Sequence, residues 1–111
     1  MISSPFPFLR IKVMLGDRDY EEDALLDTGF NGDVAVPYHV ELDPSGRTTE
    51  LILGDGSLIR ARSQLGQVQL GDLEPVPAEI IAMGSNFVIG TGILRHYEVI
   101  LDHGQRVIVN L

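Results

Sequence analysis

Hydrophobic and polar residues alternate along the chain in short runs that end at Gly, Pro or Asp, which is typical of β-strands joined by turns. A turn at Gly16-Asp17 joins the first two runs into a hairpin, and Asp55-Gly56 predicts another, because this pair adopts the positive φ angles of tight turns. Prolines favour a sheet edge for the run at 75–82. We expect an all-β protein with one or two helical turns near 93–97. The predicted strands are 8–15, 20–26, 33–36, 49–53, 58–70, 75–82, 87–89, 97–101 and 106–111.

One run differs from the others because three apolar residues, 24–26, lead directly into Asp27, Thr28 and Gly29. The apolar residues predict a buried strand, and Gly29 permits a tight turn at its end. Carboxylates are rarely buried without a partner. Asp27 is therefore either an ordinary turn or cap residue or a reactive group.

The second half of the chain repeats the first in degenerate form. Residues 13–17 (VMLGD) match 68–72 (VQLGD), and 24–30 (ALLDTGF) match 87–93 (FVIGTGI), in the same order. Each half predicts a hairpin, a buried strand and a Thr-Gly loop, and an internal pseudo-twofold would set the two loops side by side. Gly90 stands where the first half has Asp27, so one chain carries half of a two-carboxylate site.

A pair of close carboxylates has a definite chemistry. The two groups share a proton, so that one can activate water as a general base while the other polarises a carbonyl as a general acid. A chain with one such group must borrow the second from another copy, and a C2 dimer places identical residues across its axis. The Thr28 hydroxyl could brace the two loops across that axis, and Gly29 leaves its N–H available to the carboxylate.

At this point the sequence resembles a known family. Leu25-Leu26-Asp27-Thr28-Gly29, Val34-Ala35-Val36-Pro37, Val88-Ile89-Gly90 and Ile93-Leu94-Arg95 occur in the order found in retropepsin-type aspartic proteases, and in particular in the single-domain proteins of this type from bacteria. The resemblance covers nearly the whole chain. It implies a single domain over 1–111, a small closed β-barrel of the retropepsin (acid protease) type with one short helix near the C-terminus, an obligate homodimer, and hydrolysis of peptides or unfolded proteins without metal or covalent intermediate.

The resemblance also assigns roles to residues. Asp27, Thr28 and Gly29 are the expected catalytic residues, and the hairpin around residues 53–58 is the expected flap over the substrate. Expected substrate contacts are Phe30, Asn31, Gly54, Asp55, Gly56, Ser57 and Ile89. The alternative is a catalytically inactive peptide-binding or dimerisation module on the same scaffold.

Three positions depart from the retroviral members of the family. Phe30 replaces a small residue, and its ring would either narrow the peptide cleft or fill a gap in the core. Asn31 and Thr91 replace an acid and an arginine that form a structural ion pair, so both partners are missing together. Pro5 and Pro7 weaken the N-terminal strand, which shifts the expected dimer contacts to 97–111.

Composition limits the other possibilities. Sixteen acidic residues against eight basic ones give a net charge of −8, which disfavours nucleic acid and anionic membranes as partners. The absence of cysteine excludes disulfides and thiolate metal sites, the three histidines lack paired metal spacing, and 27–38 fails as a calcium loop because Tyr38 stands where the bidentate Glu belongs. We expect no metal and no cofactor. Without a signal peptide or a run long enough to span a membrane, a cytoplasmic protein is expected.

Overall fold

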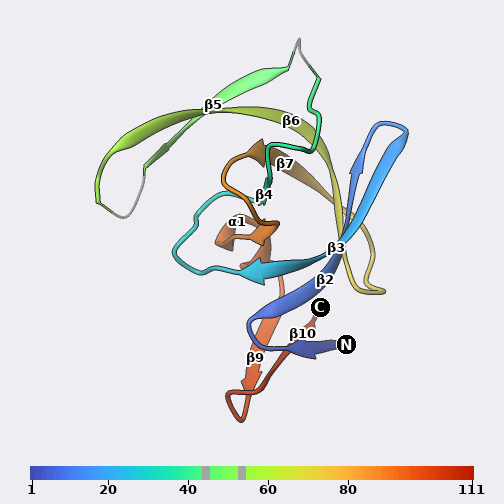
Figure 1. Cartoon of the computed structure of the whole chain (residues 1–111). Helices are drawn as coiled ribbons and strands as arrows, with labels where there is room; N and C mark the ends of the chain where they lie inside the picture. The colour runs from blue at the N-terminus through green and yellow to red at the C-terminus, as the bar shows by residue number, and fades with distance from the viewer. Residues whose placement is uncertain (44–45, 53–54) are drawn as a thin grey trace.

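The computed structural model describes residues 1–43, 46–52 and 55–111, so the expected role of Gly54 lies outside the described residues. Nearly all of the regular structure is β, with one four-residue helix (Figure 1). The elements are β1 (Ile2–Pro5), β2 (Phe8–Leu15), β3 (Arg18–Leu26), β4 (Val34–Val36), β5 (Arg47–Ile52), β6 (Leu58–Leu70), β7 (Val76–Ala82), β8 (Val88–Ile89), α1 (Thr91–Leu94), β9 (Glu98–Asp102) and β10 (Arg106–Asn110).

The larger sheet closes into a barrel. Its strands follow the order β2-β3-β8-β4-β7-β6-β5, and a further pairing of β2 with β6 joins six of them into a ring. Strand β6 is long enough to pair first with β5, then with β7 and finally with β2. A Cβ on Gly66 would lie 2.5 Å from the Met14 carbonyl oxygen, so a glycine is required where β6 meets β2. The expected closed β-barrel with one short helix is confirmed.

Alternation in the sequence explains the core. In β2 every second side chain is buried, and these side chains form the centre of the main core inside the barrel: Leu9, Ile11, Val13 and Leu15. A second, smaller cluster (Phe30, Ala35, Leu51, Ala61 and Ile81) lies apart from the main core. Burying side chains of this size stabilises the fold by about 1.5–3 kcal/mol each, so both clusters contribute substantially to holding the strands.

A smaller sheet, in the order β1-β10-β9, lies below the barrel in Figure 1. The backbone connects it to the barrel through the turn between β1 and β2, because Phe6 donates to the Gln105 carbonyl at 2.9 Å and Leu26 donates to the Pro7 carbonyl at 2.7 Å. Strands β1 and β9 are the two edge strands of this sheet. No helix in the described part of the chain is long and apolar enough to cross a membrane.

Two expectations about individual elements were wrong. Strand β7 is not an edge strand but lies between β4 and β6. Its prolines are tolerated because Pro75 precedes the strand, and Pro77 lies where β7 pairs with β6 alone, before the pairing with β4 begins at Ile80. The helical turn spans Thr91–Leu94 rather than 93–97, because its first backbone bonds run back to the carbonyl of Gly90.

The predicted internal repeat is confirmed by the pairing of its two halves. Strands β3 and β8 are parallel neighbours, with Leu25 opposite Val88 and Leu26 opposite Ile89. Strands β2 and β6 pair with Val13 opposite Val68. The two copies of each repeated segment therefore lie side by side, which places the two Thr-Gly loops next to each other.

Candidate functional site

Asp27 lies directly after β3, in the loop of residues 27–32 that we call the first loop. Its N–H donates to the Ile89 carbonyl at 3.0 Å, and its Oδ1 accepts the N–H of Gly29 at 2.9 Å. The Asp27 side chain is half-buried, whereas Thr28 and Gly29 are exposed. The local bonds thus hold one carboxylate at an open face of the molecule, with no ion pair to it among the described residues.

The second loop, residues 90–92, is hydrogen-bonded to the first. Thr91 donates to the Phe30 carbonyl at 2.8 Å, and Gly92 donates to the Gly32 carbonyl at 3.0 Å. The Gly90 backbone is extended, with φ −103° and ψ −179°, so conformation does not require glycine there. Space does, because a Cβ on Gly90 would lie 2.5 Å from the Phe30 carbonyl oxygen and 2.6 Å from the Phe30 ring. The second loop has no room for an acid of its own.

Asp33 connects the second loop to strand β7, a role that sequence reasoning missed. Its Oδ2 accepts the backbone N–H of Glu79 at 2.9 Å, its carbonyl accepts the N–H of Gly90 at 3.0 Å, and its Oδ1 occupies the space where a Cβ on Gly92 would lie. The sequence offered one signal for this role: Asp33 directly precedes the buried strand β4. A polar group at such a position needs hydrogen-bond partners.

Phe30 fills a gap in the core instead of narrowing a cleft. Only 9% of the residue is exposed, and its ring packs in the second cluster with Leu51 of β5 and Ala61 of β6. A Cβ on Gly32 would lie 2.5 Å from the far end of the ring. The ring thus takes space that a side chain at position 32 would need, and the expectation that Phe30 contacts substrate is corrected to a supporting role.

Ile89 is also placed differently from the expectation. Its side chain is fully buried in the main core, so it supports the loop and does not reach a substrate. Asn31 is exposed and remains available for contacts. Thr91 uses its backbone N–H, and more weakly its hydroxyl at 3.4 Å, on the Phe30 carbonyl. Hydrogen bonds from Thr91 therefore connect the two loops.

The remaining expected site residues lie at the end of the β5–β6 hairpin. The backbone N–H of Ser57 donates to Asp55 Oδ1 at 2.9 Å, and its hydroxyl donates to the same oxygen at 2.6 Å. These bonds, that of the hydroxyl first, lower the pKa of Asp55 below its ordinary value of 3.8. Gly56 has φ +85°, which explains the glycine in this turn. The hairpin predicted from Asp55-Gly56 is confirmed, with Ile52 paired to Leu58.

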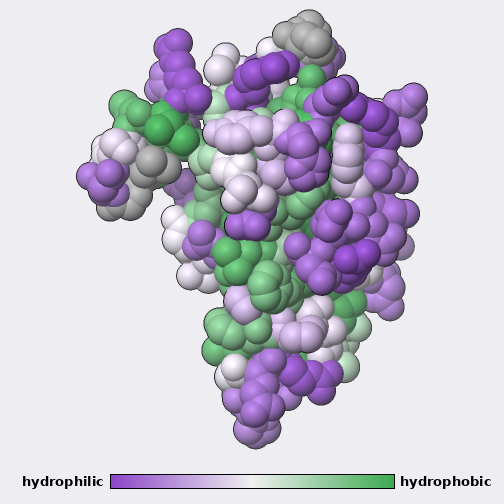
Figure 2. All heavy atoms as spheres, viewed as in Figure 1, coloured by the Kyte–Doolittle hydropathy of each residue, from purple (hydrophilic) through white to green (hydrophobic). Residues whose placement is uncertain are grey.

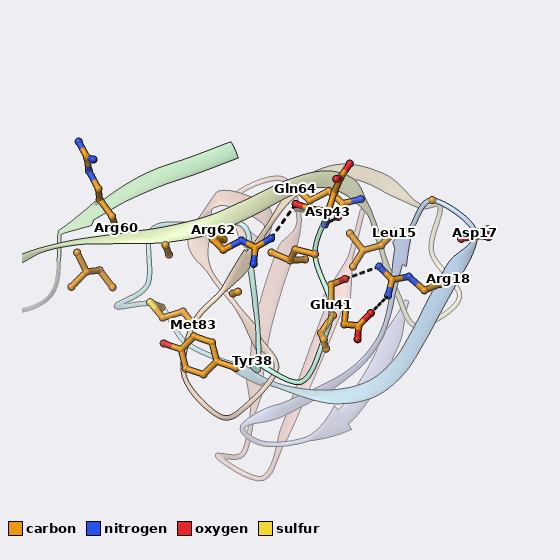
Figure 3. Close-up of a pocket in the computed structure, with 16 residues that line it drawn as sticks. Leu15, Asp17, Arg18, Tyr38, Glu41, Asp43, Arg60, Arg62, Gln64 and Met83 are labelled. Atoms are coloured by element: carbon orange, nitrogen blue, oxygen red, sulfur yellow. Dashed lines mark hydrogen bonds and ion pairs between the residues drawn. The ribbon is translucent and has the colours of Figure 1, made fainter. Parts of the chain in front are cut away.

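The largest cavity lies away from Asp27. It has a volume of about 800 Å³ and is bounded by the β2–β3 turn, the segment from Tyr38 to Asp43, strand β6 and the end of β7 (Figure 3). No residue of the first loop lines it. Its three arginines all have partners, because Arg18 and Arg62 donate to the backbone carbonyls of Glu41 and Asp43, and Arg60 pairs with Glu50. Each of these arginines thus already has a hydrogen-bond or ion-pair partner within the chain.

A smaller cavity of about 360 Å³ includes Leu25 and Phe8. Asp27 does not line this cavity either. Among the described residues no group of three or more His, Asp or Glu could hold a metal ion. A scan against protein-family models and a search of curated proteins found no match for this chain.

Proposed function

We propose that the protein is an aspartic endopeptidase with a retropepsin-type fold, active as a homodimer. One observation carries the proposal: the two Thr-Gly loops of the sequence repeat lie side by side, and only the first has an acid at the repeat position. Gly90 has no space for a second carboxylate, so a two-carboxylate site requires Asp27 from another copy. C2 symmetry supplies it without any further residue.

The proposed reaction follows from the shared proton of two close carboxylates. The ionised Asp27 takes a proton from a water held between the two subunits, and the water oxygen attacks the peptide carbonyl carbon. The protonated Asp27 donates a hydrogen bond to the carbonyl oxygen and stabilises the negative charge that develops there. A proton then passes to the leaving nitrogen as the C–N bond breaks. The Gly29 N–H, bonded to Asp27 Oδ1 at 2.9 Å, fixes the carboxylate orientation.

The outer strand β9 supports the dimer. Its three consecutive apolar residues, Val99, Ile100 and Leu101, are 39%, 41% and 55% exposed. They lie on a strand that pairs only with β10, and such edges recruit further strands. Figure 2 shows apolar surface in the lower part of the molecule, around β9 and the turn between β1 and β2. That turn is bonded to Leu26, next to Asp27, so the small sheet is connected to the strand that carries the acid.

The test is cleavage of an unfolded protein substrate over a range of pH. Asp27→Asn should lower the rate by about 10³-fold or more, since it removes acid–base catalysis. Asp72→Asn, in an exposed turn, is the matched control and should retain the rate. Sedimentation at micromolar concentration should show a dimer for all three proteins. Retained cleavage by Asp27→Asn, or a strict monomer that cleaves, would refute the mechanism.

Subunit mixing tests the shared site directly. If each active site needs two Asp27 residues, equal amounts of wild type and Asp27→Asn that exchange freely leave about one quarter of the dimers active. Activity per wild-type chain then falls to about half. A site contained in one chain would keep the full activity per wild-type chain.

The second candidate is an inactive peptide-binding or dimerisation module. It is favoured by the position of the largest cavity, which the first loop does not line. A dimer that binds peptides without cleaving them at any pH, with carboxylates too far apart to share a proton, would support this reading.

A further inference from the structure

The β5–β6 hairpin projects from the barrel with little backbone support. Strand β5 pairs only with β6, and β6 pairs only with β5 from Leu58 to Arg62. Pairing with β7 begins at Ser63. In Figure 1 the hairpin extends to one side of the barrel beyond that point. Side-chain contacts must therefore set where its free end lies.

Apolar contacts on the inner face of the described part of the hairpin belong to the second cluster. Leu51 and Ile59 are opposite one another and belong to or pack against the second cluster, as does Ala61. Ile59 and Ala61 also line the cavity of about 800 Å³, which is the cavity drawn in Figure 3. Arg62 contributes a polar contact to the Asp43 carbonyl at 3.2 Å. The apolar support of the hairpin is thus concentrated in the second cluster, with open space beside it.

Phe30 is the member of that cluster that comes from the first loop. It follows Asp27 by three residues, and its own N–H donates to the Asp27 carbonyl at 3.3 Å. The loops are built around the ring, because Gly32 and Gly90 both lack the space for a Cβ beside it. One aromatic side chain therefore shares a cluster with the hairpin, including Leu51 near its turn, and belongs to the segment that carries Asp27.

We infer that Phe30 is a positioning residue that couples the β5–β6 hairpin to the first loop. The ring fixes the hairpin against the first loop, and its removal raises the free-energy cost of ordering the hairpin around a bound peptide. The catalytic part of this inference rests on the proposed endopeptidase function, whereas the mechanical part does not. A purely structural role would instead predict a uniform loss of stability.

The chain offers a matched control in Phe87. It is 7% exposed, similar to Phe30, but packs in the main core. Phe30→Ala and Phe87→Ala remove the same atoms from the two clusters. Phe30→Leu retains most of the apolar volume and serves as the conservative variant, with Phe87→Leu beside it.

Amide hydrogen exchange reports the mechanical part. Phe30→Ala should speed the exchange of the amides that join β5 to β6 by about tenfold or more relative to those that join β2 to β3. Phe87→Ala should show no preference for the hairpin. Phe30→Leu should show a smaller effect of the same kind, and it carries the comparison if the alanine variants do not fold. Equal profiles for the Phe30 and Phe87 variants would overturn the inference.

Kinetics report the catalytic part. Phe30→Ala should raise KM for a peptide substrate by about tenfold while kcat changes less, because binding includes the ordering of the hairpin. Phe30→Leu should restore most of the affinity. Unchanged KM in a variant with faster hairpin exchange would refute the catalytic consequence. Absence of cleavage by the wild type would refute the proposed function alone, since the exchange comparison still decides the coupling.

Discussion

The two Thr-Gly loops have related sequences and adjacent positions, yet they serve different purposes. The first loop exposes Thr28 and Gly29 and holds the Asp27 carboxylate with one local N–H. The second loop buries Gly90 and Gly92 and leads into the only helix in the described part of the chain. Related sequences thus carry an exposed acidic loop in one half and a buried packing contact in the other.

This difference explains why the fold points to a second molecule. A scaffold with internal pseudosymmetry can hold two carboxylates in one chain when each loop provides one. Here the Phe30 ring and the Phe30 carbonyl occupy the space at position 90. The second loop therefore serves packing, and in the proposed mechanism the second acid comes from another copy of the chain.

The largest expected effect comes from making the second loop like the first. Gly90→Asp should destabilise the fold by about 4 kcal/mol or more, because it overpacks the Phe30 site and buries a charge without a partner. Denaturant unfolding measures this, with Asn31→Asp on the exposed side of the first loop as control. A stable, folded Gly90→Asp protein would break the comparison, since the second loop could then have kept an acid.

The next largest effect is a loss of dimerisation, which tests whether the second Asp27 carboxylate comes from another copy of the chain. Ile100→Lys puts a charge in the apolar edge strand β9 and should weaken dimerisation by about 2 kcal/mol or more. Cleavage should fall with the fraction of dimer, while the circular dichroism of the monomer stays native. Leu65→Lys, at a side chain that is 63% exposed on β6, is the control. Full activity of a monomeric Ile100→Lys protein would show that the chain needs no partner.

The smallest expected effect is a change in the pKa of Asp55, which depends on hydrogen bonds within one hairpin and not on a second copy of the chain. Ser57→Ala should raise the pKa of Asp55 toward 3.8, because the hydroxyl bond that lowers it is lost. In the wild type this bond favours the charged carboxylate, so its contribution to the turn is present above the unfolded pKa and is lost as pH falls through the lowered folded value. NMR titration of Asp55 measures the shift. It should be the same in wild type and in Ile100→Lys, since the bond lies within one hairpin.

Much of the fold was predictable from the sequence because the signals are local. The run 8–15 and strand β2 coincide, since alternation fixes which side chains turn inward. Asp55-Gly56 gave the hairpin because tight turns depend on two or three residues. The loop at Asp27 was predictable from an apolar run followed by Asp-Thr-Gly. The strand at 75–82 was predictable, but its place inside the sheet was not, because the sheet neighbours of a strand depend on distant segments.

The sequence by itself determined that this chain is a β protein with one acid where its internal repeat would allow two. Turns, alternation and the repeat are contained in neighbouring residues, so they needed no tertiary information. Only the tertiary structure decided where the Phe30 ring lies and that Ile89 is buried. The physical reason is that a side chain packed between two segments can occupy only the space that both segments leave open. In this chain that space lies between the first loop, Gly90 and the β5–β6 hairpin, which are far apart in sequence.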